Sequence, residues 1–450
     1  MLRTIWNELK ATDFDDFLYP KGLLIFNVLL GAGEAIFFWA NFGKGIDLIE
    51  VGLIALSIFV VFLFWLYARR PKINNSKSIG IVFAIRSDDR KVRKRVRGDL
   101  IEGIESFLKS CTPLEEAKVI VEPEHISAKI VSAKDAEKFL TQIAKGHLIV
   151  FGKAVEREFL DGEPAYVITT GVYVRHAEIP KKVSEEVGKE FGTFYPMRVA
   201  FRTKEEIYGF EVTKNNMALC LGYILGTAAL LSRDWLMSYD LFTKLSTLLE
   251  EVKEENNATY YQLNRISRKR LAQSAINLSV GHYLEYIRNR SVKSLKKMGK
   301  LIEEVNGLGG TNKHSVLLES IFYFLNGRDI ANAKKVLKKR IKNRSADHLF
   351  SEAFLLAYEE KFTLANNAYT KAFRGTPTSV KDVIFFFEMI LGEEPKKWML
   401  WYFLGLIKLK YQVNPDEGLQ HLAMLSTNTE VPIGLRQNSQ KKLDKLKKII

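Results

Sequence analysis

The chain of 450 residues has very few cysteines and none of the common motifs of nucleotide or metal chemistry. Its two cysteines, Cys111 and Cys220, lie among apolar neighbours, which argues against a disulfide framework and a cysteine-based metal site. The sequence contains no GxxxxGK[ST] motif, no HExxH motif and no cluster of cysteine and histidine. We therefore expect a protein without a bound metal, without a cofactor and without enzymatic activity.

Long apolar runs are also scarce, and the two that exist lie near the start of the chain. The runs Leu23–Ala40 and Val51–Tyr67 each approach the roughly 20 apolar residues that a membrane-spanning helix needs. Arg69 and Arg70 follow the second run, and the short connection between the runs carries a single lysine. Since positive charge stays on the cytoplasmic side, the pattern predicts a two-helix hairpin in the inner membrane, with both termini cytoplasmic.

One acidic residue, Glu34, interrupts the first apolar run. It follows Gly31 and Gly33, small residues that allow helices to pack closely. A carboxyl group deep in lipid is costly unless it is paired or faces protein. Two interpretations follow: a protonated Glu34 at a helix–helix contact, or several hairpins whose Glu34 side chains share a polar seam. The second interpretation makes the protein a homo-oligomer through the hairpin.

After the apolar runs, short apolar strands alternate with helices. Strands are expected at 78–85, 118–121, 147–152, 155–159 and 165–174, and helices at 99–108 and 133–144, with Ser132 as the cap of the second helix. This alternation predicts a small α/β sheet. The order of the elements, with Phe151-Gly152 before the hairpin, resembles the small amino-terminal domain of TolB-like proteins. That domain also precedes helical repeats in some membrane-tethered signalling proteins.

The region 217–425 has a helical pattern that repeats itself. In its clearest unit, 353–373, large residues on one helix meet small residues on the next around a polar turn. The turns near Gly327 and Lys361 are about one 34-residue repeat apart. The arrangement is similar to the tetratricopeptide (TPR) repeat. This resemblance implies a curved helical solenoid that binds a protein partner.

The net charge of +15 comes from 67 lysines and arginines against 52 acidic residues, and it favours anionic partners. The densest basic run follows the first predicted strand, at the sheet edge where α/β proteins bind ligands. Its predicted anion- or lipid-binding residues are Arg86, Arg90, Lys91, Arg93, Lys94, Arg95 and Arg97. A solvated helix face is the alternative. Nucleic acid is a weaker candidate, reached only indirectly, because stacking aromatic residues are not interleaved with the charges.

These observations predict a membrane-anchored multidomain protein with a two-helix hairpin, a small α/β domain and a C-terminal all-α, TPR-like solenoid. The predicted order is a cytosolic segment at 1–21, the transmembrane hairpin at 22–70, a linker at 71–77, the α/β domain with an extension at 78–212, the repeat domain at 213–425 and a basic helix at 426–450.

Two functions fit this organisation. The first is a non-enzymatic, membrane-anchored adaptor or effector whose TPR-like body binds a protein partner while the hairpin tethers to, or perturbs, the inner membrane. Anionic membrane lipids are then further partners, and the layout resembles membrane effectors of prokaryotic antiviral defence systems. The alternative is a membrane-bound sensor of a nucleotide or other phosphorylated small ligand, which would bind to the α/β domain.

Overall fold

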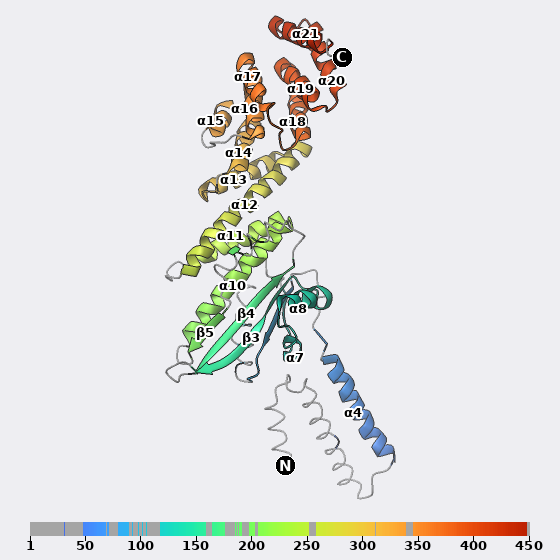
Figure 1. Cartoon of the computed structure of the whole chain (residues 1–450), viewed down its shortest axis with the longest axis vertical. Helices are drawn as coiled ribbons and strands as arrows, with labels where there is room; N and C mark the ends of the chain where they lie inside the picture. Colours follow the sequence, from blue (N-terminus) through green and yellow to red (C-terminus); the bar gives the residue numbers. More distant parts are fainter. Residues whose placement is uncertain are drawn as a thin grey trace. The chain divides into compact units, whose positions relative to one another are not determined.

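The computed structural model describes residues 31, 48–68, 70–71, 80–89, 92, 98, 101, 105, 118–158, 164–175, 185, 187, 189–190, 198–202, 206–251, 258–310, 312–338 and 345–447. The chain forms two compact units, Met1–Leu271 and Ala272–Ile450. A small α/β sheet lies in the first unit, and the described part of the second unit is helical (Figure 1). Helix α12, Ala258–Asn289, contributes residues to both units.

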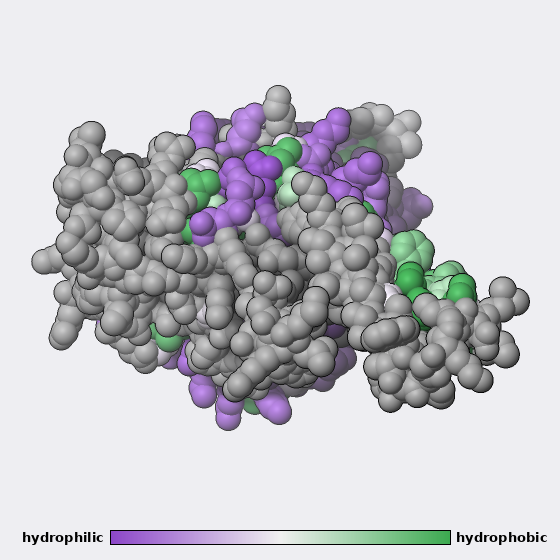
Figure 2. All heavy atoms as spheres, turned by 90° about the horizontal axis from the view of Figure 1, so that it is seen from below, coloured by the Kyte–Doolittle hydropathy of each residue, from purple (hydrophilic) through white to green (hydrophobic). Residues whose placement is uncertain are grey.

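Helix α4, Leu48–Ala68, contains the second apolar run. Its exposed apolar side chains gather at the right-hand edge of the molecule in Figure 2, and they include Val51, Leu53, Leu56, Phe59, Val60, Phe62, Leu63 and Leu66. A spanning helix needs about 20 apolar residues in succession. Among the residues that the structure describes, no helix is long and apolar enough to cross a membrane. The predicted location, a multi-pass protein of the inner membrane, is therefore contradicted.

The sheet has five strands in the order β2-β1-β3-β4-β5. The strands are β1 Gly80–Arg86, β2 Lys118–Val121, β3 Leu148–Glu158, β4 Pro164–Val174 and β5 Arg198–Arg202. Strand β1 pairs in parallel with β2 and β3, whereas β4 runs antiparallel to both β3 and β5. The predicted small α/β sheet is thus confirmed.

Both faces of β1 and β3 are buried, which explains why these strands read as nearly continuous apolar runs. On one face, Val82 and Ile149 pack with side chains of the short helical segments α7 Glu124–Ser127, α8 Ala133–Lys138 and η3 Phe139–Ala144. On the other face, Phe83 and Val150 share a core with helices α10 Glu206–Leu231 and α11 Trp235–Glu251.

Two details of the sheet differ from the prediction. The strands expected at 147–152 and 155–159 are one strand, because the pairing of β3 with β4 runs unbroken from Leu148 to Glu158. Gly152 lies inside this strand. Position 152 needs a glycine because a Cβ atom there would collide with the carbonyl oxygen of Thr169 on β4. Strand β5 was not predicted. The cap at Ser132 is confirmed, because its side chain and that of Asp135 form a capping box.

The second unit consists of successive helices, of which α14 and α15, α16 and α17, and α19 and α20 pack as neighbouring pairs. Their bounds are α13 Val292–Gly307, α14 Lys313–Leu325, α15 Ile330–Lys338, α16 Ala346–Tyr358, α17 Phe362–Ala372, α18 Val380–Glu393, α19 Trp398–Tyr411, α20 Pro415–Thr427 and α21 Ile433–Lys447. This mostly helical C-terminal half is compatible with a helical repeat solenoid.

Polar ties join one helix pair to the next at similar sequence separations. The Nε2 atom of His348 lies 3.0 Å from the carbonyl oxygen of Lys313, which is 35 residues away. The Thr378 hydroxyl donates to Asp347 over 31 residues, and the Tyr411 hydroxyl donates to the Gly375 carbonyl over 36 residues. These separations are close to one TPR-like repeat length of about 34 residues.

Candidate functional site

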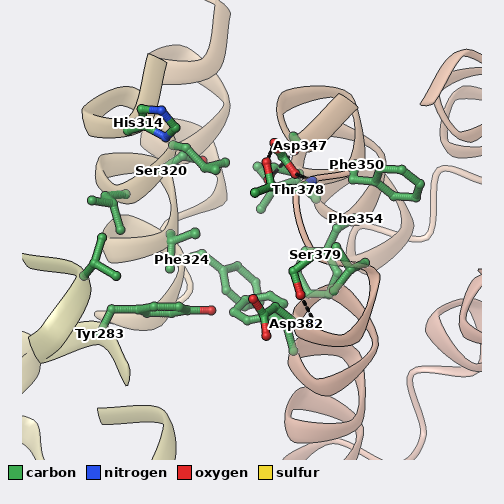
Figure 3. Close-up of a pocket in the computed structure, with 18 of the residues that line it drawn as sticks. Tyr283, His314, Ser320, Phe324, Asp347, Phe350, Phe354, Thr378, Ser379 and Asp382 are labelled. Atoms are coloured by element: carbon green, nitrogen blue, oxygen red, sulfur yellow. Dashed lines mark hydrogen bonds between the residues drawn. The ribbon is translucent and has the colours of Figure 1, made fainter. Parts of the chain in front are cut away.

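The helical body contains an apolar pocket of about 320 Å³, shown in Figure 3. Its walls come from helices α12, α14, α16 and α18, together with the residues just before α18. Most of the lining side chains are apolar, and they are Val280, Leu317, Leu318, Ile321, Phe324, Phe350, Phe354, Leu355, Val383, Phe386 and Phe387. A site of this size and character suits a small ligand or one large side chain.

Capping residues fix where the walls of the pocket begin. Asn312 accepts hydrogen bonds from the backbone N–H groups of His314 and Ser315 and starts α14. Ser379 accepts a hydrogen bond of 3.2 Å from the N–H of Asp382 and starts α18. Such caps satisfy N–H groups that a helix cannot pair internally. The polar ends of both helices therefore lie at the pocket, and their apolar middles form its walls.

Asp347, in the first turn of α16, holds the segment before α18 in place. Its Oδ1 atom accepts a 2.8 Å hydrogen bond from the N–H of Thr378, and its Oδ2 atom accepts a 2.7 Å bond from the Thr378 hydroxyl. In Figure 3 this pair lies on the upper right of the pocket. Because both carboxylate oxygens are engaged, Asp347 positions the rim of the pocket.

Aromatic rings form a wall deep in the pocket. Phe324 is 1% exposed, and its ring meets the Phe354 ring edge to face at 5.1 Å. Phe386 adds a third ring, 5.0 Å from Phe354 and 6.1 Å from Phe324 between centroids. Contacts between rings in such tilted or perpendicular arrangements stabilise a core beyond the area that they bury. This wall, here called the aromatic wall, comprises Phe324, Phe354 and Phe386.

The aromatic wall is supported by a charged network made by Arg328 in the turn after α14, Tyr358 at the end of α16 and Glu394 just after α18. The Arg328 guanidinium lies 4.7 Å from the centre of the Phe324 ring, and its Nε donates to Glu394 at 3.0 Å. The Tyr358 hydroxyl also donates to Glu394, at 2.7 Å. Burial opposes ionisation of Glu394, but the hydrogen bonds from Tyr358 and Arg328 lower its pKa below the ordinary value. The carboxylate therefore stays charged and holds the arginine against the ring.

Two polar groups face the interior of the pocket from opposite sides. Tyr283 on α12 points its hydroxyl group toward the interior, and the Asp382 carboxylate of α18 lies across from it (Figure 3). Burial raises the pKa of Tyr283 well above its ordinary value, and the negative charge of Asp382 adds to this effect. The hydroxyl therefore remains a hydrogen-bond donor and acceptor at every physiological pH.

The charge of the pocket differs from that of the whole chain. Among the lining residues that the structure describes, the ionisable side chains are Tyr283, His314, Asp347 and Asp382, and there is no lysine or arginine. Within the described ranges, the Asp382 carboxylate accepts no hydrogen bond and lies in no ion pair. The pocket is thus apolar and locally acidic in a chain with a net charge of +15.

Comparisons with known proteins give no relative on which to model this pocket. No protein-family model matches the chain. No curated protein and no solved structure is significantly similar to it. The resemblances to TPR repeats and to TolB-like domains therefore stay predictions, and the pocket has to be interpreted from its own chemistry.

The predicted anion-binding run lies mostly outside the described residues, which include Arg86 but not Arg90, Lys91, Arg93, Lys94, Arg95 or Arg97. Arg86 ends β1 and is partly buried. Just beyond it, the N–H of Ser87 donates to Glu124 at 2.9 Å, and Lys153 pairs with Asp88 at 2.6 Å. Anion binding at this edge stays a prediction.

The residues singled out in the first apolar run are also largely outside the described part. Glu34 and Gly33 lie beyond it. A Cβ atom at Gly31 would lie 3.8 Å from the Cδ1 atom of Ile58 in α4, which is ordinary van der Waals contact. The roles proposed for Glu34 and for this glycine pair remain untested.

The residues of the pocket were not predicted as a site from the sequence. Tyr283, Phe324 and Asp382 are spread over about a hundred positions and meet only through the stacking of helix pairs. The aromatic run Phe385-Phe386-Phe387 was a visible signal, because three consecutive aromatic residues on a helix cannot all face the same core.

Proposed function

We propose that the protein is a non-enzymatic adaptor or effector whose helical body binds a protein partner, and that the pocket receives an anchor side chain of that partner. The observation that carries this proposal is the pocket itself, an apolar hollow walled by several successive helices. Helical solenoids offer extended surfaces for peptides and proteins. Binding energy at such surfaces concentrates on a few side chains that fill pockets.

A photo-cross-linking residue placed in the pocket tests this proposal. Benzoylphenylalanine replaces Phe386, which lines the pocket, in the full chain produced in its native cells. The matched control carries the same residue at Phe385, the preceding position on α18, which is 49% exposed and does not line the pocket. We expect irradiation to link one protein to position 386 and to leave position 385 largely unlinked. Equal labelling at both positions would contradict the proposal.

Filling the pocket is an independent test. The substitution Val383→Trp places a large side chain at a lining position. The substitution Val292→Trp makes the same change at a position that is 61% exposed and outside the pocket. We expect the first variant to lose the partner cross-linked through position 386 and the second variant to retain it, as measured by co-purification. Retention of the partner by both variants would place the binding surface elsewhere.

A further inference from the structure

The pocket combines an aromatic wall with the Asp382 carboxylate, which has no lysine or arginine beside it in the described part of the chain. Resting on the proposed function, we propose that the anchor is an arginine side chain of the partner, with its guanidinium group held between the Asp382 carboxylate and the aromatic wall. The apolar stem of the arginine would pack along the leucine and isoleucine side chains of α14, which line the same pocket.

Charge complementarity is the first support for this proposal. The pocket presents the carboxylates of Asp347 and Asp382, and none of its described lining residues is a lysine or arginine. Asp347 is engaged by Thr378, whereas the carboxylate of Asp382 makes no hydrogen bond or ion pair within the described part of the chain. An incoming cation would therefore meet a solvent-exposed carboxylate without an ion-pair partner, beside the apolar walls of the pocket.

The aromatic wall is the second support. The quadrupole of an aromatic ring attracts a cation placed over its face. The helical body already uses this chemistry internally, since Arg328 lies over Phe324 and pairs with Glu394. Lys397 likewise lies 4.3 Å from the centre of the Tyr358 ring. Among the described residues that line the pocket, Phe354, Phe386 and Asp382 have no lysine or arginine with them, so a ligand would have to supply the cation.

The geometry favours a guanidinium group over an ammonium group. A guanidinium is planar, stacks on aromatic rings and donates several N–H bonds in a fixed arrangement. Asp382 can accept two of these bonds, and the Tyr283 hydroxyl oxygen on the opposite wall can accept another. An ammonium group is more strongly hydrated and does not stack, so it gains less from this site.

Two small probes of similar shape separate charge from apolar contact. Phenethylguanidinium carries the cation on an aromatic body, and 3-phenylpropanamide is a neutral counterpart. Binding of each to the purified full chain is measured by ligand-observed NMR titration. We expect the cation to bind about tenfold more tightly than the amide, and raised salt to reduce this preference.

Two matched variants locate the charge that the probe senses. Asp382→Asn removes the carboxylate charge in the pocket, and Asp416→Asn removes the same charge from another exposed aspartate, outside the pocket. Both aspartates lie in the first turn of a helix, so the two changes affect the helix dipole alike. We expect Asp382→Asn to weaken the cation about five- to tenfold and to leave the amide unchanged. Asp416→Asn should change neither.

The outcomes distinguish this inference from the proposed function. Equal affinity for both probes, or an unchanged cation affinity in Asp382→Asn, overturns the arginine anchor. If cross-linking at position 386 still captures a partner in that case, the partner binds through an apolar anchor and the proposed function stands. If the cation binds as expected and no partner is captured, the pocket is a cation site and the proposed function fails.

Discussion

Two regions of the helical body differ in whether a charged side chain next to apolar residues has a partner of opposite charge. In the pocket, Asp382 presents a carboxylate with no cation beside it among the described residues. Between α18, α19 and α20, the Lys408 side chain is 1% exposed, and its Nζ atom lies 2.6 Å from Glu388 and 2.8 Å from Glu417. Among the described residues, Lys408 has two acidic partners, whereas the Asp382 carboxylate has no basic partner. Removing the partners of such a completed site leaves a buried charge unpaired, whereas an incomplete site is available to a ligand.

The strongest test of this comparison removes the partners of the lysine. In the double variant Glu388→Gln/Glu417→Gln, the buried ammonium group loses both negative charges. We expect a loss of about 3–5 kcal/mol in the free energy of unfolding, because an unpaired charge would remain in the core. Urea denaturation followed by circular dichroism measures it.

The matched control for that variant is Lys408→Met, which removes the buried charge itself. Glu388 and Glu417 are 43% and 42% exposed in their side chains, so water can solvate both after the lysine is gone. We expect this variant to be clearly more stable than the double glutamine variant. If the double variant unfolds at the wild-type urea concentration, the lysine site is not the closed structural site described here.

A smaller effect is expected at the rim of the pocket. Thr378→Val keeps the size of the side chain but removes the hydroxyl group that donates to Asp347. The backbone N–H bond of 2.8 Å remains, so we expect a loss of about 1–2 kcal/mol in unfolding free energy and weaker cross-linking at position 386. Thr370→Val is the control, since that exposed hydroxyl donates only to Asn366 in its own helix. Equal effects of the two changes would show that the Asp347–Thr378 pair does not organise the rim.

The smallest effect concerns pH. The Nε2 atom of His348 lies 3.0 Å from the Lys313 carbonyl oxygen, which can only accept, and its Nδ1 atom lies 2.7 Å from the Ser345 hydroxyl oxygen. Burial lowers the pKa of His348 below its ordinary 6.5. The unfolded chain therefore binds the proton first as pH falls, and stability should decline below about pH 6.5 by at most about 1.4 kcal/mol per pH unit.

A single substitution at His348 separates its contribution to the pH dependence from those of the other histidines. Burial also lowers the pKa of His147 and of His421, so the wild-type profile contains several contributions. The difference between wild type and His348→Gln between pH 5 and pH 8 reports His348 alone. We expect that difference to grow as pH rises through 6.5. A constant difference would mean that His348 has the same pKa in both states.

The sheet and the pocket show what the sequence could and could not predict. Strand β2 and the cap at Ser132 follow from local signals, and both were predicted at the residues where they occur. Gly152 was predicted to be the last residue of a strand. The actual reason for that glycine is the closeness of Thr169 on the partner strand, which no local pattern reveals. Whether a strand position requires glycine thus depends on the neighbouring strand with which it pairs.

The pocket was beyond local patterns for a related reason. A helical pattern shows which face of each helix is apolar, but it does not show where two apolar faces fail to fill the space between them. Tyr283 and Asp382 are 99 positions apart in the sequence and face each other only after the intervening helices have stacked. The predicted spans illustrate the opposite error, because apolar runs and their flanking positive charges suggested a location that the described helices do not support.

The hydrogen bonds between successive helix pairs also affect the order in which the helical body unfolds. Each tie joins residues only 31 to 36 positions apart, so each layer is fastened to its immediate neighbour. Under mechanical load or rising temperature, helix pairs at an end of the helical body should therefore unfold first while the other pairs remain folded. Hydrogen exchange would then be graded along the chain, slowest in the middle layers around the pocket. A partner bound there would clamp the layers that open last.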